Sequence, residues 1–279
     1  MELNSHALTQ IDAEREQTNN NEDTESFVRI EDKFVISKSH LPALLSLLNS
    51  NLEPCYFGEK TEFNEIESLY FDSATLKVYQ DHFQEGLNRF KLRLRTYAPN
   101  GVYPSESEPV HLEMKQKADG VCRKFRFKVG PTEKQELLQG KPIPPAYALR
   151  KKKATLRERL LQVNSTIGFH KLRPQARVTY QRLAFERDGF RVTVDDKIQT
   201  QVLAPVDQAL REKVINSPEF AKAKEMIARY QNGDVVIVEV KHSGSIPAWI
   251  QSFFDNQQIA TASFSKYAFT ISRHLLENK

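Results

Sequence analysis

Basic side chains recur at every second position along three stretches of the chain, and this pattern constrains the fold more than any other feature. In residues 89–97, one set of alternate positions holds Arg89, Lys91, Arg93 and Arg95, and the other holds Phe90, Leu92 and Leu94. Successive side chains of a β-strand point to opposite faces of a sheet. We therefore expect a strand with one basic face and one apolar face.

The next two predicted strands repeat the arrangement. Residues 110–117 place Glu113, Lys115 and Lys117 on one face and Leu112 and Met114 on the other. Residues 122–129 place Lys124, Arg126 and Lys128 opposite Phe125, Phe127 and Val129. The first and last predicted strands add Arg29, Glu31 and Lys33, and Glu239 and Lys241.

A charged strand face commonly means only that this face meets water. A solvated face, however, normally mixes the two signs of charge, because like charges repel across neighbouring strands. Three consecutive strands with a single-sign face are best compensated by a polyanionic ligand. Arg and Lys suit phosphate oxygens, and the chain has neither a GxxxxGK[ST] motif nor a GxGxxG motif after a strand. We therefore expect strand side chains to bind an inorganic polyphosphate or a nucleoside triphosphate.

Hydrophobic periodicity and turn residues divide the chain into alternating segments. Strands are expected at residues 27–36, 65–71, 89–97, 110–117, 122–129, 177–186, 189–195 and 234–241. Helices are expected at residues 41–48 (with Ser37 as N-cap), 73–79, 147–163, 205–230, 246–254 and 263–276. Turns are expected at Asp119-Gly120, Asp188-Gly189 and Asn232-Gly233.

About eight strands with helices at their connections indicate an α+β fold, and we expect a closed antiparallel eight-stranded β-barrel with flanking helices. Residues 1–25 are polar and nearly free of large apolar side chains, which predicts a disordered tail. With no internal repeat and no Gly/Ser-rich linker, residues 26–279 form one expected domain.

Composition excludes several classes of protein. Cys55 and Cys122 are the only cysteines, which argues against a disulfide framework or a structural zinc site. No apolar run reaches the length of a membrane span, and the N-terminus lacks the features of a signal peptide. A reduced, cytoplasmic location is the expectation. The formal net charge of +4 is small for a protein that coats nucleic acid.

Few acids share the basic faces. Glu31, Glu113 and Glu239 are either internal salt-bridge partners or ligands of a divalent metal that bridges phosphates. Glu239 is the best metal candidate, because it lies on a very apolar strand with Lys241 as its main basic neighbour. No nucleophilic triad stands out among the scattered histidines.

Several motifs in order resemble a known family. They are RIEDKF at 29–34, YFDS at 70–73 with Tyr79 after it, KLRLRTY at 91–97, LEMK at 112–115, YQRLAF at 180–185, VEVK at 238–241 and FSKY at 264–267. Together, over about residues 27–275, they resemble the VTC domain. This is the polyphosphate polymerase domain of the vacuolar transporter chaperone complex, within the CYTH-like triphosphate tunnel metalloenzyme superfamily.

The resemblance implies an eight-stranded tunnel whose basic lining grips a triphosphate. It implies an enzyme that transfers the γ-phosphoryl group of ATP to a growing polyphosphate chain with a divalent metal, Mn²⁺ or Mg²⁺. The implied catalytic residues are Lys33, Arg93, Arg95, Lys115, Arg182 and Lys266. Phosphate binding would add Lys91, Lys124, Arg126, Tyr180 and Ser265, and Glu239 would hold the metal. Lys266 is expected to reach the tunnel mouth from a helix outside the barrel.

One departure concerns the first strand. The related CYTH triphosphatases carry ExExK there, whereas this chain has Arg29, Glu31 and Lys33 at the three positions. The loss of one acid argues against triphosphate hydrolysis as the main activity. The alternatives are a hydrolase of the same fold and a non-catalytic polyphosphate-binding regulatory protein.

A single-stranded nucleic-acid binder is disfavoured. Such proteins stack bases on aromatic rings beside their basic groove, whereas Phe90, Phe125 and Phe127 lie on the face opposite the cations. The expected partners are ATP and inorganic polyphosphate, together with a possible membrane protein that receives the product. The sequence leaves the oligomeric state open.

Overall fold

A single antiparallel sheet organises the molecule. The computed structural model describes residues 30–56, 63–84, 88–118, 121–150, 154–230 and 234–277. The strands are β1 (Ile30–Ser37), β2 (Glu53–Pro54), β3 (Asn64–Asp72), β4 (Arg89–Pro99), β5 (Val110–Ala118), β6 (Val121–Val129), β7 (Arg173–Arg187), β8 (Phe190–Val202) and β9 (Val235–His242). They pair in the order β1-β9-β8-β7-β3-β4-β5-β6, with the short β2 added beside β7.

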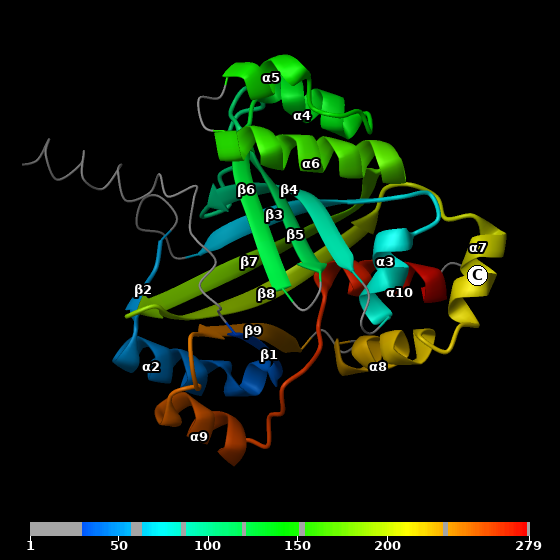
Figure 1. Ribbon diagram of the computed structural model, residues 1–279. Helices are drawn as coiled ribbons and strands as arrows, with labels where there is room; N and C mark the ends of the chain where they lie inside the picture. Colours follow the sequence, from blue (N-terminus) through cyan, green and yellow to red (C-terminus); the bar gives the residue numbers. More distant parts are fainter. Residues whose placement is uncertain are drawn as a thin grey trace, which may run out of the picture.

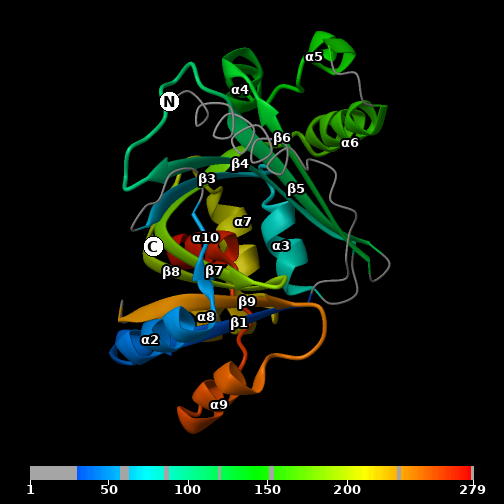
Figure 2. The same ribbon diagram turned by 90° about the vertical axis from the view of Figure 1, so that its left-hand side faces the viewer.

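The sheet curls but does not close, so the predicted closed barrel is wrong. Strands β1 and β6 form its two ends, and within the described residues they do not pair with each other. Figure 2 looks into the curl, with β3 and β4 above β7 and β8 and with β1 and β9 below. Closure would require β6 to pair with β1, and both strands carry cations on their inner faces, Lys124 on β6 and Lys33 on β1, so like charges would be brought together.

Helices pack on both sides of the curled sheet. They are the short 3-10 turn η1 (Lys38–His40), α2 (Leu41–Asn51), α3 (Lys77–Phe83), α4 (Pro131–Leu138), α5 (Pro145–Arg150), α6 (Ala154–His170), α7 (Gln208–Ile215), α8 (Phe220–Tyr230), α9 (Ala248–Asn256) and α10 (Lys266–Glu277). Helices α2 and α9 lie against β1 and β9, and α4, α5 and α6 lie over β4, β5 and β6 (Figure 1).

Two buried clusters follow from this arrangement. The first joins the apolar faces of β4, β5 and β6 to α6, through residues such as Leu112, Phe127 and Val163. The second joins β1, β8 and β9 to α2 and α9, through residues such as Phe34 and Val238. Because the apolar faces of β4, β5 and β6 pack against α6, the basic faces of these strands turn toward the inside of the curl.

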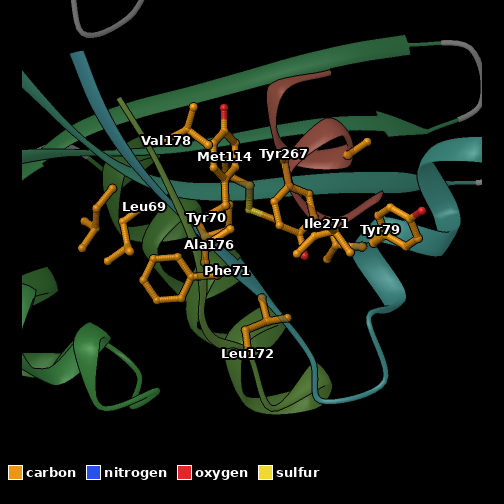
Figure 3. Close-up of a cluster of buried hydrophobic side chains, with 14 of the residues drawn as sticks. Leu69, Tyr70, Phe71, Tyr79, Met114, Leu172, Ala176, Val178, Tyr267 and Ile271 are labelled. Atoms are coloured by element: carbon orange, nitrogen blue, oxygen red, sulfur yellow. The ribbon is translucent and has the colours of Figure 1, made fainter. Parts of the chain in front are cut away.

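Helix α10 packs inside the curl, against β7 and β8 and against helices α3, α7 and α8. Tyr267 of α10 stacks on Tyr70 of β3 with ring centroids 5.3 Å apart. Figure 3 shows these two rings in the same buried cluster, together with Ile271 and Tyr79. The helix therefore fills part of the concave side and brings its first residues to the basic face.

Most predicted elements are confirmed, with shifted bounds. The predicted helix at residues 205–230 is two helices, α7 and α8, with Pro218 between them. The predicted helix at residues 147–163 is α5 followed by α6, which ends at His170. Positive φ angles at Asp188 and Gly189 confirm the turn between β7 and β8. The turns at Asp119-Gly120 and Asn232-Gly233, and the predicted tail at residues 1–25, lie outside the described residues.

Ser37 accepts a hydrogen bond from the backbone N–H of Ser39, so it caps the turn that leads into α2. Strand β2, only two residues long, carries too little pattern to be predicted. In the part of the chain that the structure describes, no helix combines the length and the apolarity that a bilayer crossing requires.

Candidate functional site

The register of β4, β5 and β6 lines up basic side chains across the inner face. Lys91 pairs with Lys115, which pairs with Lys124. Directly opposite one another are also Arg93, Glu113 and Arg126. The first row contains three cations and no acid, and the second contains two cations around one carboxylate.

Glu113 is the carboxylate that lies among the cations of these strands. Its side chain is only 3% exposed, and Oε2 accepts hydrogen bonds from Arg93 Nη2 at 2.6 Å and from Nε at 2.9 Å. Arg126 Nε and Lys124 Nζ lie 3.4 Å and 3.8 Å from Oε1. Burial opposes ionisation of Glu113, but the cations around it, Arg93 foremost, hold its pKa well below the ordinary value. The carboxylate is therefore ionised, and its negative charge offsets the repulsion between these cations.

Asp195 of β8 plays the same part on the other side of the curl. Arg182 donates to its two oxygens at 2.6 Å and 2.7 Å, and Lys266 Nζ donates to Oδ2 at 2.5 Å. The Asp195 side chain is 1% exposed. Burial opposes its ionisation, but Arg182 and Lys266 lower its pKa below the ordinary value. A single buried carboxylate thus fixes two of the predicted phosphate ligands.

Asp195 is a site residue that the sequence analysis missed. Strand β8 alternates Val192, Thr193, Val194 and Asp195, so its period of two already places Asp195 on the polar face. The faces of this strand were not assigned from the sequence, and β8 continues beyond the predicted end at residue 195 to Val202.

Tyr180 positions two cations. Its hydroxyl accepts a hydrogen bond from Arg95 Nη2 at 3.1 Å, and Lys266 Nζ lies 4.4 Å from the centre of its ring. Arg95 Nε donates to Ser68 Oγ at 3.2 Å. Arg95 is thus held by neutral groups on two sides, with Glu113 at 3.6 Å as its nearest acid.

Lys91 is half-buried beside other cations. Its Nζ donates to Ser265 Oγ at 2.9 Å and lies 3.4 Å from His82 Nδ1. No carboxylate among the described residues pairs with it. Burial and the neighbouring charges of Lys33 and Lys115 lower the pKa of Lys91 to about 7, and burial together with Lys91 lowers the pKa of His82 to about 2. This corner of the site holds the least compensated positive charge.

Strands β1 and β9 contribute a mixed cluster. Lys33 Nζ lies 2.8 Å from Glu31 Oε1 and 3.9 Å from Glu239 Oε2, and Lys241 Nζ lies 2.8 Å from Glu239 Oε1. Burial opposes ionisation of Glu239, but Lys241, Lys33 and Arg182 hold its pKa well below the ordinary value. Glu31 and Glu239 are close enough for each to feel the other's charge.

These two carboxylates fit a divalent metal. Mg²⁺ is usually held by one or two carboxylates and completed by substrate phosphates and water. Thr193 lies directly opposite Glu239 in the sheet, and its buried hydroxyl has no hydrogen-bond partner among the described residues. No group of three or more His, Cys, Asp or Glu side chains in the described ranges forms a metal site by itself. Glu239, with Glu31 beside it, therefore suits an ion that arrives together with a phosphate chain.

Asp72 fixes the start of α10. Its carboxylate accepts hydrogen bonds from the backbone N–H groups of Ser73, Val78 and Tyr79 and from the Tyr267 hydroxyl at 2.5 Å. Since Tyr267 follows Lys266 directly, Asp72 anchors the helical turn from which Lys266 reaches Asp195. The motifs at residues 70–73 and 264–267 are therefore one structural unit.

The structure gathers all the predicted site residues on the inner face or at its ends. They are Lys33, Lys91, Arg93, Arg95, Lys115, Lys124, Arg126, Tyr180, Arg182, Glu239, Ser265 and Lys266. One expected position is wrong. Lys266 does not approach from outside the sheet, because α10 lies inside the curl and Lys266 meets Asp195 and Tyr180 there. The roles of these residues in binding and catalysis stay predictions.

Comparison with known proteins adds one firm assignment. No match was found among curated proteins. A solved structure from Bacillus halodurans, described as an adenylate cyclase candidate, shares 11% identity over 85% of this chain and 94% of its own, with a TM-score of 0.47. An adenylyl cyclase candidate from Hippeastrum, described as having a dominant triphosphatase activity, shares 15% identity over 88% and 96%, with a TM-score of 0.47. Neither likeness is close enough to bear on function.

The family comparison is different in extent, because the VTC domain model matches residues 28–274. This range contains every strand and every predicted site residue that the structure describes. The chain belongs to the VTC domain family.

Proposed function

We propose that this protein is a polyphosphate polymerase that transfers the γ-phosphoryl group of ATP to a growing polyphosphate chain on the inner face of its curled sheet. Membership of the VTC domain family supports a polyphosphate-related function. The observation that carries the proposal is the row formed by Lys91, Lys115 and Lys124, three cations from three strands. Lys115 and Lys124 share the nearby carboxylates Glu31 and Glu113 with other cations, and Lys91 has no carboxylate partner among the described residues. A polyanion would offset the remaining positive charge.

Arginine and lysine would divide the work of binding. The forks of Arg93, Arg95 and Arg182 suit pairs of phosphate oxygens, and the ammonium groups of Lys91 and Lys266 act as point charges. Because Glu113 and Asp195 already hold the arginines in place, little reorganisation is needed when phosphate arrives.

Catalysis of phosphoryl transfer depends mainly on positioning the reacting groups and neutralising charge on the phosphates. A terminal oxygen of the phosphate chain would attack the γ-phosphorus in line. The bond between that phosphorus and the bridging oxygen would break, and ADP would leave. The attacking oxygen is already anionic near neutral pH, so the reaction needs no general base.

Glu239, with Glu31 beside it, would hold Mn²⁺ or Mg²⁺. The ion would neutralise charge on the phosphate oxygens in the transition state. Three cations would act directly on the substrate. Arg93 and Arg95 would orient the phosphate groups, and Lys266 would balance the charge that develops on them. A cytoplasmic location and a membrane partner that takes up the product stay predictions.

The test is an incubation of the protein with ATP, Mn²⁺ and a short polyphosphate primer. Polyphosphate would be resolved on a gel, and ADP and free phosphate would be quantified. Long product with a matching amount of ADP supports the proposal. Free phosphate without long product means a hydrolase, and polyphosphate binding without either product means a non-catalytic binding protein.

A pair of variants makes the assignment specific. Lys266→Met removes a cation that meets Asp195 and Tyr180, and it should reduce product by at least about a hundredfold. Lys141→Met is the matched control, because Lys141 is largely exposed and its one ion pair within the described ranges is with Glu136 at 3.8 Å. Equal activity of the two variants would remove the inner face as the site of transfer.

A further inference from the structure

The two ends of the curled sheet differ in chemistry. At one end a pocket opens beside β2 and α2, lined by Leu45, Asn49, Pro54, Cys55, Tyr56, Phe63, Asn64, Arg182, Leu183, Ala184 and Phe185. At the other end a pocket opens beside α3 and α8, where Arg89, Lys222 and Arg229 face a single acid, Glu225. Figure 1 shows β2 and α2 on the left of the molecule and α3 and α8 on the right. One end is thus mainly apolar and aromatic, and the other is basic.

The apolar pocket and the basic face share one residue. Arg182 lines this pocket and also forms the ion pair with Asp195 that belongs to the phosphate site. Arg182 is thus the residue through which a ligand in the pocket would meet the phosphate site.

The pocket contains a polar group that lacks a partner. Asn64 is the first residue of β3 and pairs with Arg182 of β7 in the sheet. It is only 7% exposed, and within the described part of the chain its Oδ1 has no hydrogen-bond partner. Buried polar atoms are nearly always satisfied, so this amide oxygen calls for a donor from a ligand.

The other walls favour a flat, partly apolar ligand. Tyr56 and Phe63 provide aromatic surface, and Leu45 and Pro54 provide aliphatic surface. Purine and pyrimidine bases combine a π face with hydrogen-bond donors at the edge, and stacking on aromatic side chains tolerates different bases. A phosphate chain, which has neither an apolar surface nor a donor for Asn64, does not suit these walls.

We propose that this pocket binds the nucleoside of the nucleoside triphosphate, with Asn64 accepting a hydrogen bond from the base or the ribose. The triphosphate then passes Arg182 onto the basic face, and the phosphate chain occupies the end near Arg89. This inference rests on one part of the proposed function, namely that the basic face binds a triphosphate.

The experiment compares two ligands that share a triphosphate and differ in the nucleoside. ATP and inorganic tripolyphosphate would be titrated calorimetrically into the protein in EDTA, so that no turnover occurs. Asn64→Leu keeps the size of the side chain and removes the amide, and Tyr56→Ala removes one aromatic wall. Each should weaken ATP binding roughly tenfold, equivalent to about 1.4 kcal/mol, and leave tripolyphosphate binding within about twofold.

Tyr103→Ala is the matched control, since Tyr103 is 43% exposed, close to the 37% of Tyr56, and lies outside the pocket. Melting curves identify any variant that fails to fold. If Asn64→Leu does not fold, Tyr56→Ala still tests the inference, because Tyr56 is exposed and its replacement should not disturb the fold. Equal weakening of both ligands, or no change in either, overturns the inference and leaves the proposed function standing. Failure of the unmodified protein to bind either ligand overturns both.

Discussion

The carboxylate of Glu31 on β1 lies 3.5 Å from the ammonium group of Lys115 on β5, although the two strands share no backbone pairing. This ion pair spans the gap at which the sheet fails to close. The backbone leaves the curl open, and side chains reach across it. Glu31 also pairs with Lys33, so one carboxylate offsets cations that come from both sides of the gap.

Replacing Glu31 with Gln should strengthen the binding of tripolyphosphate several-fold in metal-free buffer. The change removes the carboxylate that competes with phosphate for Lys33 and Lys115. Both ion pairs of Glu31 are partly exposed, with Lys33 at 27% and Lys115 at 50%, so we expect their loss to alter the free energy of unfolding by less than about 1 kcal/mol for each pair. Calorimetric titration measures the affinity, with Glu106→Gln at an exposed position as control. Unchanged or weaker binding would contradict a competing role for Glu31.

Raising the pH should weaken polyphosphate binding and, at the same time, stabilise the ligand-free protein. Burial and neighbouring cations lower the pKa of Lys91 to about 7, whereas the unfolded chain keeps it near 10.5. Between these values the unfolded state binds more protons, so the free energy of unfolding rises with pH. Polyphosphate favours the charged ammonium, so its affinity falls over the same window. The charged and titratable groups that face Lys91 are Lys33, His82, Arg89, Arg93 and Lys115.

Melting temperature and dissociation constant, each measured from pH 6.5 to 9, check both signs. Lys124, whose pKa burial and nearby cations also lower to about 7, contributes in the same direction. In Lys91→Met both slopes should become shallower. Slopes that match those of the unmodified protein would show that Lys91 does not titrate in this range.

Asp195→Asn should destabilise the ligand-free protein by about 3–5 kcal/mol, because it leaves Arg182 and Lys266 buried without their shared carboxylate. Urea unfolding measures the change. Asp196→Asn is the neighbouring control, since Asp196 forms one partly exposed ion pair with Lys38 and should cost less than about 1 kcal/mol. Tripolyphosphate should recover more stability in Asp195→Asn than in the unmodified protein. A cost below that of the control would mean that the two cations do not need Asp195.

Tyr267→Phe should reduce stability by about 1–3 kcal/mol, because it removes one donor from the buried carboxylate of Asp72. It should also lower the rate of phosphoryl transfer, since Lys266 adjoins Tyr267 at the start of α10. Thermal melting and product assays measure the two effects. Tyr103→Phe, which removes an exposed hydrogen bond to Glu65, should leave both unchanged.

Alternation along single strands was enough to predict the basic face. Lys91, Arg93 and Arg95 share a face because a strand has a period of two, and no knowledge of the neighbouring strands is needed. The same reasoning placed Lys115, Lys124 and Arg126, and the structure brings all of them to the inside of the curl. The family assignment rested on motif order and was equally accessible.

Closure of the sheet could not be read from the sequence. Whether β1 pairs with β6 depends on shear and on the repulsion between cations from strands far apart in the chain. The position of Lys266 inside the curl depends on the bond between Tyr267 and Asp72, which are 195 residues apart. Contacts of this kind join residues far apart in the sequence, and no local sequence pattern predicts them.

The open ends of the sheet have a consequence for how copies of this protein behave toward one another. An unpaired strand offers its backbone to any other strand, and charged side chains are one defence against such edge-to-edge association. The edge strand β6 carries Arg123, Lys124, Arg126 and Lys128, which disfavour the approach of a second β6. Neutralising these residues to study ligand binding would therefore also remove a safeguard against aggregation.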